Sequence, residues 1–145
     1  MSLYLDTSLV VSALVQEEAS EAVHDWLASR SSFRFAVSDW VATEFSAALS
    51  RKRALHQISA ALREEAQLQF DSLLAAEFDV LPVSREEFRL AAHLAGQSLQ
   101  GLRAGDALHL AIAKTNAVTL CTRDIKLAAA GIDLGCSTQL VGPNS

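Results

Sequence analysis

RAGDALHLAIAKTNAVTLCT, residues 103–122 of the chain, contains a helix pattern followed directly by a strand pattern. The helix is predicted from about Gly105 to Lys114 and is apolar on nearly every side, which predicts a buried position. A short apolar run from Val118 to Cys121 predicts a buried strand. A buried helix that leads into a buried strand is typical of proteins in which helices cover a parallel sheet.

The same alternation of short apolar runs and helical patterns extends over the whole chain. Strands are predicted at 3–5, 33–38, 78–82 and 118–121, with a further edge strand at 132–134. Helices are predicted over 9–15, 19–29, 39–53, 56–76, 84–99, 105–114 and 125–130. This order predicts the α/β class: a three-layer α/β/α sandwich around a mostly parallel sheet of four or five strands, in a single domain spanning 1–145.

Composition limits the classes of function. Half of the 145 residues are hydrophobic and a fifth are charged, with 12 Lys and Arg against 17 Asp and Glu. The net charge of −5 excludes a uniformly basic protein that coats phosphates. It does not exclude a nucleic-acid enzyme, because carboxylates gathered around a metal ion contribute to the same sum. The first cationic side chain is Arg30, no apolar run is long enough for a membrane span, and the two cysteines form no CxxC pair. We therefore expect a cytoplasmic protein with no membrane partner.

Four acidic residues occupy positions that ordinary solvent exposure does not explain. Asp6 and Asp124 each follow a predicted strand, and the carboxyl ends of parallel strands meet at one edge of a sheet. Glu44 lies within the apolar arc of its helix, with no cationic residue three or four positions away. Asp106 opens the apolar helix quoted above. These four side chains are the candidates for a shared site.

Each acid also has an ordinary structural interpretation. Asp6 and Asp124 fit helix caps, and Asp106 fits an ion pair with Arg103. Glu44 is harder to explain, because a buried carboxylate without a partner is destabilising or takes up a proton. Four converging carboxylates would repel one another, and a divalent cation would relieve that repulsion. Hard oxygen donors without paired His or Cys favour Mg²⁺ or Mn²⁺ over zinc.

These acidic segments resemble those of the PIN domain. The resemblance covers about 3–135, and the build is similar to that of VapC-type toxins of toxin–antitoxin pairs. Its segments are Asp6-Thr7-Ser8, Glu44 on the third helix, the stretch 103–111 around Asp106, and Thr122-Arg123-Asp124. The resemblance implies that Asp6, Glu44, Asp106 and Asp124 are the catalytic metal ligands. It also implies that the hydroxyl residues Ser8 and Thr122 orient these ligands.

The implied activity is Mg²⁺- or Mn²⁺-dependent hydrolysis of RNA phosphodiester bonds, neutralised by a small cognate antitoxin. Arg103, Arg123 and Lys126 flank two of the acids and are candidate RNA contacts. The run Arg51-Lys52-Arg53 fits either an RNA contact or an ordinary cationic helix end. The resemblance further implies a homodimer, for which the helix after His56 could supply a face.

The main alternative is a PIN-type scaffold that binds RNA or a protein partner without cutting. Four retained acids argue against it, because a non-catalytic descendant has no reason to bear their mutual repulsion. A phosphatase of the haloacid-dehalogenase type needs a second Asp two residues after the first, where Ser8 stands. No glycine-rich nucleotide loop is present. His109 belongs to no catalytic triad pattern and is interpreted as a buried residue with satisfied hydrogen bonds.

Overall fold

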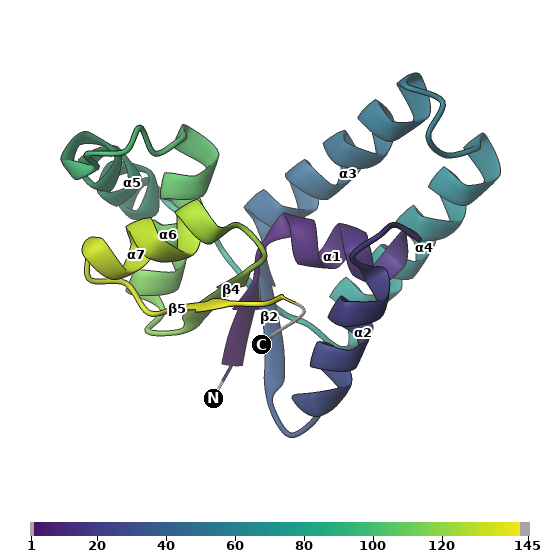
Figure 1. Cartoon of the computed structure of the whole chain (residues 1–145), viewed down its shortest axis with the longest axis horizontal. Helices are drawn as coiled ribbons and strands as arrows, with labels where there is room; N and C mark the ends of the chain where they lie inside the picture. Colours follow the sequence, from purple (N-terminus) through teal and green to yellow (C-terminus); the bar gives the residue numbers. More distant parts are fainter. Residues whose placement is uncertain (1, 143–145) are drawn as a thin grey trace.

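Five parallel strands form the central sheet of the computed structural model, which describes residues 2–142 (Figure 1). The strands are β1 (Ser2–Leu5), β2 (Arg34–Ser38), β3 (Asp79–Leu81), β4 (Thr119–Thr122) and β5 (Thr138–Leu140), in the spatial order β3-β2-β1-β4-β5. Every neighbouring pair is parallel. The predicted α/β class with a parallel sheet is therefore confirmed.

Seven helices of the described residues cover the two faces of this sheet. They are α1 (Thr7–Leu14), α2 (Ser20–Ser29), α3 (Asp39–Ala54), α4 (Ala60–Ala76), α5 (Arg85–Gln97), α6 (Ala104–Thr115) and α7 (Ile125–Asp133). Figure 1 shows α1 to α4 on one side and α5 to α7 on the other, with α3 and α4 forming a long hairpin that projects from the body. This is the predicted three-layer arrangement.

The strand order places the ends of β1, β2 and β4 side by side. β1 is central: Tyr4 is in register with Ala36 of β2, and Leu5 is in register with Cys121 of β4. The chain moves from β1 toward β2 along one half of the sheet and enters the other half through β4. Ligand sites of open parallel sheets form where the strand order reverses in this way. The segments that follow β1 and β4 meet at this edge.

Helix α6 is the buried helix expected from its sequence. All residues from Ala107 to Ala113 are buried, His109 among them. The helix packs against α5 and against β4, so the apolar pattern that surrounds it has a partner on each side. Its N-terminus lies at the sheet edge where β1 and β4 end, and this places Asp106 beside the segments after those strands.

The predicted edge strand at 132–134 is wrong. Helix α7 continues to Asp133, and the last strand is instead β5. Gly135 follows at φ +77°, and the Cys136 N–H donates to the Gly131 carbonyl at 2.8 Å. A left-handed glycine with this hydrogen bond is a Schellman helix end. Gly135 was the sequence signal for the end of α7.

The long helix predicted over 56–76 begins four residues later than expected. His56 adopts a positive φ of 58°, which interrupts the helical path between α3 and α4. Ser59 then caps α4 by accepting a hydrogen bond of 3.1 Å from the Leu62 N–H. Within residues 2–142, no helix has both the length and the apolar character needed to cross a bilayer.

Candidate functional site

Asp6 lies directly after β1 and is 5% exposed, so its carboxylate depends on protein hydrogen bonds. Oδ1 accepts from the Ser8 hydroxyl at 2.8 Å and from the Leu9 N–H at 3.1 Å. Oδ2 accepts from the Thr122 hydroxyl at 2.5 Å. Asp6 therefore caps α1, as its ordinary interpretation states. It is also tied to the end of β4.

Asp124 follows β4 and caps α7. Its Oδ1 accepts from the N–H groups of Lys126 at 2.9 Å and Leu127 at 3.1 Å. Its own N–H donates to the Thr122 hydroxyl at 3.0 Å. One hydroxyl thus joins the segments that carry Asp6 and Asp124. The resemblance implied that Ser8 and Thr122 orient the ligands, and both hydroxyls donate to Asp6.

Glu44 has two partners that its own helix could not supply. Its Oε1 accepts from the Thr7 hydroxyl and from His109 Nε2, each at 2.6 Å. The expectation of a buried and unpartnered carboxylate is therefore wrong, because α1 and α6 bring donors to it and the side chain is only partly buried. His109 is buried with satisfied hydrogen bonds, as interpreted, but its link to Glu44 was missed. The sequence signal for this link was the position of His109 one turn after Asp106 on α6.

Asp106 lies beside the end of β4, at the start of α6. A cavity of about 70 Å³ is lined by Asp106 and Asp124 together with Arg103 and Lys126. The Arg103 guanidinium lies 3.8 Å from Asp106 and is 84% exposed, which leaves it free to meet a ligand. Arg123 is directed elsewhere, because its guanidinium donates to the Val141 carbonyl at 3.4 Å. Two of the three predicted cationic contacts thus border the acids.

Burial is the largest cause of the raised pKa values of Asp6 and Asp106. Burial raises the pKa of Asp6, and the hydrogen bonds from Thr122, Ser8 and Leu9 only partly oppose it. Burial also raises the pKa of Asp106; His109 and Arg103 lower it, while the charges of Asp124 and Asp6 raise it further. The charges of Asp124 and Asp6 therefore act on Asp106.

Glu44 shows the opposite pKa direction. Partial burial acts to raise its pKa, but the hydrogen bonds from His109 and Thr7 and the charge of His109 outweigh burial and lower it. The carboxylate is therefore held in its ionised form, in which both oxygens can accept a hydrogen bond or bind a cation.

The chemistry of these acids fits a hard divalent cation, although their side chains do not converge. Among residues 2–142, no group of three His, Cys, Asp or Glu side chains is arranged to hold a metal ion. Asp6 accepts hydrogen bonds on both carboxylate oxygens, whereas Glu44 and Asp124 accept them on one oxygen each. The donors are nonetheless carboxylate oxygens, the ligands that hard divalent cations prefer, and a bound cation would favour the ionised forms that burial disfavours in Asp6 and Asp106. Joint coordination would require some of these side chains to turn.

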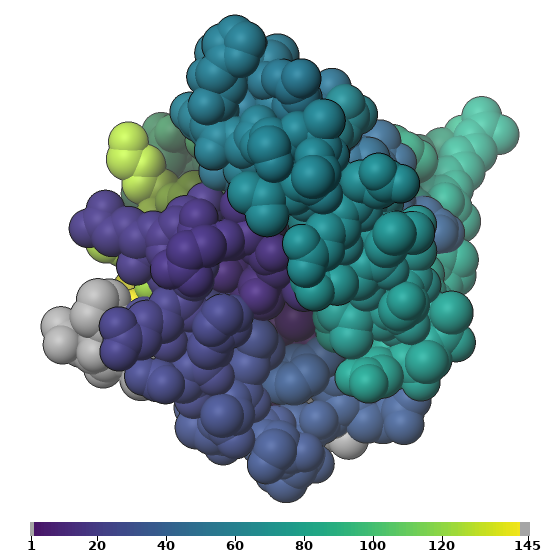
Figure 2. Space-filling model, turned by 90° about the vertical axis from the view of Figure 1, so that its right-hand side faces the viewer, coloured from purple at the N-terminus to yellow at the C-terminus, as the bar shows by residue number. Residues whose placement is uncertain are grey.

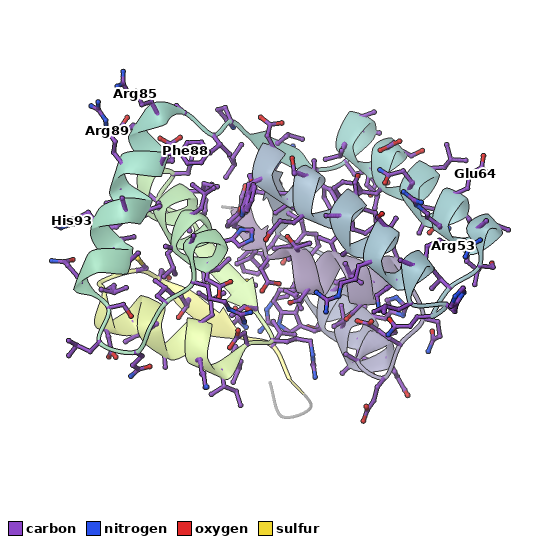
Figure 3. The ribbon with its side chains drawn as sticks, turned by 90° about the horizontal axis from the view of Figure 1, so that it is seen from above. Arg53, Glu64, Arg85, Phe88, Arg89 and His93 are labelled. Atoms are coloured by element: carbon purple, nitrogen blue, oxygen red, sulfur yellow. The ribbon has the colours of Figure 1, made fainter. Side chains whose placement is uncertain are left out.

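The cationic run at 51–53 lies away from the acids. It forms the last turn of α3, where cations complement the helix dipole. Arg53 stands nine residues beyond Glu44, roughly 13 Å along the helix axis. Figure 3 shows Arg53 near the far end of the α3–α4 hairpin, across the molecule from Arg85 of α5. Lys52 pairs with Glu17 at 3.0 Å. The position favours an ordinary helix end over an RNA contact.

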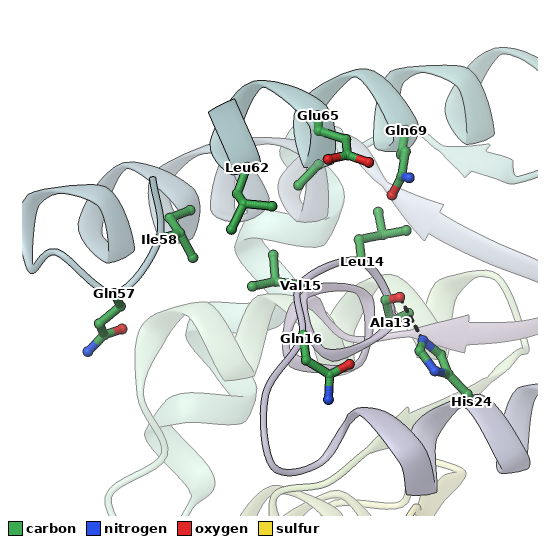
Figure 4. Close-up of a pocket in the computed structure, with 11 residues that line it drawn as sticks. Ala13, Leu14, Val15, Gln16, His24, Gln57, Ile58, Leu62, Glu65 and Gln69 are labelled. Carbon is green, nitrogen blue, oxygen red and sulfur yellow. Dashed lines mark hydrogen bonds between the residues drawn. The ribbon is translucent and has the colours of Figure 1, made fainter. Parts of the chain in front are cut away.

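A larger pocket of about 320 Å³ opens between α1, α2 and α4, away from the four acids (Figure 4). Figure 2 shows the same face, with α1 and α2 in purple and blue beside α4 in teal. Leu14, Ile58 and Leu62 supply apolar walls, and Glu65 supplies a charge. His24 on its rim bonds the Ala13 carbonyl at 2.8 Å. This pocket contains no candidate catalytic acid.

Comparison with known proteins identifies the family. The sequence matches the model of the PIN domain over residues 3–132, and the chain therefore belongs to the PIN-domain family. No curated protein sequence matches significantly.

Solved structures share the fold. VapBC2 from Rickettsia felis, bound to a promoter DNA fragment, is 19% identical with a TM-score of 0.70, covering 98% of this chain and 100% of its own. VapC20 of Mycobacterium tuberculosis, a toxin that cleaves the sarcin-ricin loop, is 16% identical with a TM-score of 0.71 over 89% and 95%. A toxin-antitoxin complex from Klebsiella pneumoniae is 17% identical with a TM-score of 0.60 over 88% and 90%. At these identities the likeness concerns the fold.

Proposed function

We propose that this PIN-domain protein is a metal-dependent endoribonuclease, the toxin of a toxin–antitoxin pair, which hydrolyses RNA phosphodiester bonds. The observation that supports this most is the concentration of Asp6, Asp106 and Asp124 at one edge of the sheet, where the charges of Asp6 and Asp124 raise the pKa of Asp106. A binding scaffold gains nothing from such repulsion. The structural likeness to an RNA-cleaving toxin supports the same reaction.

The site residues divide the work of phosphodiester hydrolysis between them. Asp6, Glu44, Asp106 and Asp124 would hold Mg²⁺ or Mn²⁺. The ion would stabilise charge on the phosphate and lower the pKa of a bound water. Ser8 and Thr122 fix the Asp6 carboxylate through the hydrogen bonds described above. Asp106, whose pKa is raised by burial, is suited to accept the proton of the attacking water.

Cationic side chains beside the acids would attract the RNA backbone. Arg103 and Lys126 border the cavity that Asp106 and Asp124 also line. An exposed guanidinium binds phosphate oxygens in two places at once, and a Lys adds a mobile positive charge. These two residues compensate locally for the acidic character of the whole chain. Arg123 has a smaller part, since it is bonded to the Val141 carbonyl.

The proposed function includes a protein partner and a place of action. A cognate antitoxin is supported by the structural likeness to a toxin-antitoxin complex. RNA and antitoxin would both be met in the cytoplasm. We further propose that two copies pair as a homodimer. Its face would include the exposed apolar side chains Leu62 and Leu68 of α4.

The test is an RNA cleavage assay on the purified protein. End-labelled structured RNAs are incubated with Mg²⁺, with Mn²⁺, or with EDTA, and the products are resolved at nucleotide length. We expect cleavage that needs the cation and is abolished in Asp6→Asn and Asp124→Asn, both of which should retain the native circular dichroism spectrum. RNA binding without cleavage under every metal condition would contradict the proposal and favour the scaffold. Cleavage that persists in both variants would show a contaminating nuclease.

A further inference from the structure

A buried chain of hydrogen bonds leads from β2 through β1 and α6 to the Glu44 carboxylate. The Ser38 and Tyr4 hydroxyls are 2.7 Å apart, and the Tyr4 hydroxyl lies 2.8 Å from His109 Nδ1. His109 Nε2 lies 2.6 Å from Glu44 Oε1. Ser38 and Tyr4 are fully buried, and His109 is 3% exposed. Each of these buried polar groups has a hydrogen-bond partner within this network, as most buried polar groups do.

The donor-to-acceptor direction of these hydrogen bonds is set by Glu44, the last residue in the series. An ionised carboxylate can only accept a hydrogen bond, so His109 Nε2 carries the proton that it shares with Glu44. Nδ1 then meets the Tyr4 hydroxyl, and this second contact fixes the orientation of the imidazole ring. A ring held at both nitrogens cannot flip without breaking both contacts. The position of Glu44 Oε1 is therefore set from the interior of the protein.

The same chain also connects Glu44 to the start of its own helix. Ser38 is the N-cap of α3 and accepts a hydrogen bond of 3.1 Å from the Val41 N–H. Its hydroxyl thus links the helix cap to Tyr4, while Glu44 links the next turn of α3 to His109. The two contacts fix α3 relative to β1 and α6. An arrangement of this kind restrains both the backbone and the side chain of Glu44.

One oxygen of Glu44 remains available. The hydrogen bonds from Thr7 and His109, each 2.6 Å long, both fall on Oε1, and within residues 2–142 no donor engages Oε2. Gly105 leaves the space beside it open: a Cβ at that residue would stand 3.3 Å from Oε2 and 3.5 Å from the Trp40 ring. Oε2 thus faces the start of α6, where Asp106 also lies.

From these contacts we infer that Ser38, Tyr4 and His109 are positioning residues that hold Glu44 by Oε1 and keep Oε2 free to bind a divalent cation. The inference rests on the proposed function, because it assumes that the acids take up such an ion. None of the three would touch the ion or the RNA. Residues that hydrogen-bond metal ligands in this way affect metal affinity about 10- to 100-fold when replaced.

The test is Mn²⁺ binding by the metal-free full chain, measured by isothermal titration calorimetry beside the cleavage assay. His109→Leu removes the donor to Glu44, and we expect roughly 10- to 100-fold weaker Mn²⁺ binding. His109→Gln restores an amide donor and should recover most of the affinity. Tyr4→Phe frees the ring at Nδ1 and should give an intermediate loss. Unchanged Mn²⁺ affinity in both His109→Leu and Tyr4→Phe would overturn the inference.

A double-mutant cycle separates positioning of Glu44 from a general structural effect. In a Glu44→Gln background, His109→Leu should cause little further loss of Mn²⁺ affinity, because its action passes through Glu44. An equal loss in both backgrounds would overturn the inference. If His109→Leu does not fold, the cycle is run with Tyr4→Phe, which keeps the ring and its packing.

A metal-independent readout completes the design. In the ¹⁵N spectrum of the metal-free protein, His109 Nε2 should give the signal of a protonated nitrogen, and Glu44→Gln should shift it. An unprotonated Nε2 would overturn the inference. Mn²⁺ binding that depends on His109 without any RNA cleavage would refute the proposed function alone. If the wild-type protein cleaves RNA but His109→Leu and Tyr4→Phe leave the Mn²⁺ affinity unchanged, the positioning role alone is refuted.

Discussion

Thr122 donates a hydrogen bond of 2.5 Å to Oδ2 of Asp6 across the junction of β4 and β1, although 116 positions separate the two residues in sequence. The same hydroxyl accepts the Asp124 N–H at 3.0 Å. Neighbouring parallel strands make this meeting possible, because Leu5 and Cys121 are in register one residue before each partner. The relationship ties two candidate metal ligands together through one side chain.

Thr122→Val tests this link by removing the hydroxyl while keeping the shape. We expect a loss of stability of about 1–3 kcal/mol, because a buried carboxylate oxygen and a backbone N–H both lose a partner. RNA cleavage should fall by roughly 10- to 100-fold, as for other residues that orient a ligand. Urea unfolding and cleavage rates measure the two effects. Thr119→Val, on the same strand but away from the acids, is the matched control and should leave cleavage unchanged.

Asp106→Asn tests whether the ionised carboxylate of Asp106 destabilises the folded protein. Burial and the charges of Asp124 and Asp6 raise the pKa of Asp106, so its ionised form is disfavoured in the folded state. Because the pKa of Asp106 is higher in the folded state than in the unfolded state, the free energy of unfolding decreases as pH rises through the folded-state pKa. At pH 8 without metal, Asp106→Asn should therefore melt at a higher temperature than wild type, and its gain should shrink at acid pH. Added Mn²⁺ should stabilise wild type more than the variant. A lower melting temperature of the variant at pH 8 would show that the ionised Asp106 does not destabilise the folded protein.

An exposed ion pair between β2 and β3 supplies a second pH prediction. Hydrogen bonds from Arg34 and Ser2 hold the pKa of Asp79 at about 2. Because this value lies below that of the unfolded chain, the stabilisation is present above the unfolded pKa and is lost as pH falls toward 2. Carboxyl NMR titration should give a midpoint near 2 for Asp79 in wild type and a clearly higher one in Arg34→Gln. Identical midpoints in the two proteins would show that the pair does not form in solution.

The two thiols should be inert in the native protein. Burial, with a smaller contribution from the charge of Asp6, raises the pKa of Cys121 to about 12, and burial also raises the pKa of Cys136. Thiolate is the reactive form, so both groups should resist a disulfide reagent at pH 8 until the protein unfolds. The measurement is the time course of labelling with and without urea. Rapid labelling of native Cys121 would show that β4 opens readily.

The sequence predicted the fold well because periodicity and burial are local signals. The apolar α6 and the strand after it show their buried positions directly in residues 103–122. The partners of Glu44 could not be predicted in the same way. Thr7 and His109 reach it from 37 and 65 positions away, and only the packing of three helices determines that contact. The acids were found because four unexplained charges stand out against an apolar background.

The prediction of an edge strand near the C-terminus was wrong for a different reason. The run at 132–134 has the short apolar character of an edge strand, but it lies at the end of α7. The decisive information was the glycine that follows: only Gly135 adopts the left-handed conformation that ends this helix with two hydrogen bonds back into its last turn. A pattern of three residues is too short to separate a helix end from a strand, whereas a terminating glycine separates them.

Two glycine substitutions test how closely the helices of this half pack. A Cβ at Gly131 of α7 would stand 2.3 Å from Thr138 Cγ2 and 2.9 Å from Leu110 Cδ2, so Gly131→Ala must push β5 and α6 away. Overpacking of this kind destabilises by about 1–3 kcal/mol. Gly96 of α5 is the matched control, since nothing lies within 4 Å of its Cβ position. Gly96→Ala should stabilise by about 0.4–1 kcal/mol, because it restricts the unfolded chain. Urea unfolding should move the two midpoints in opposite directions, and a shift in the same direction would mean that α7 is not seated against β5 as the structure shows.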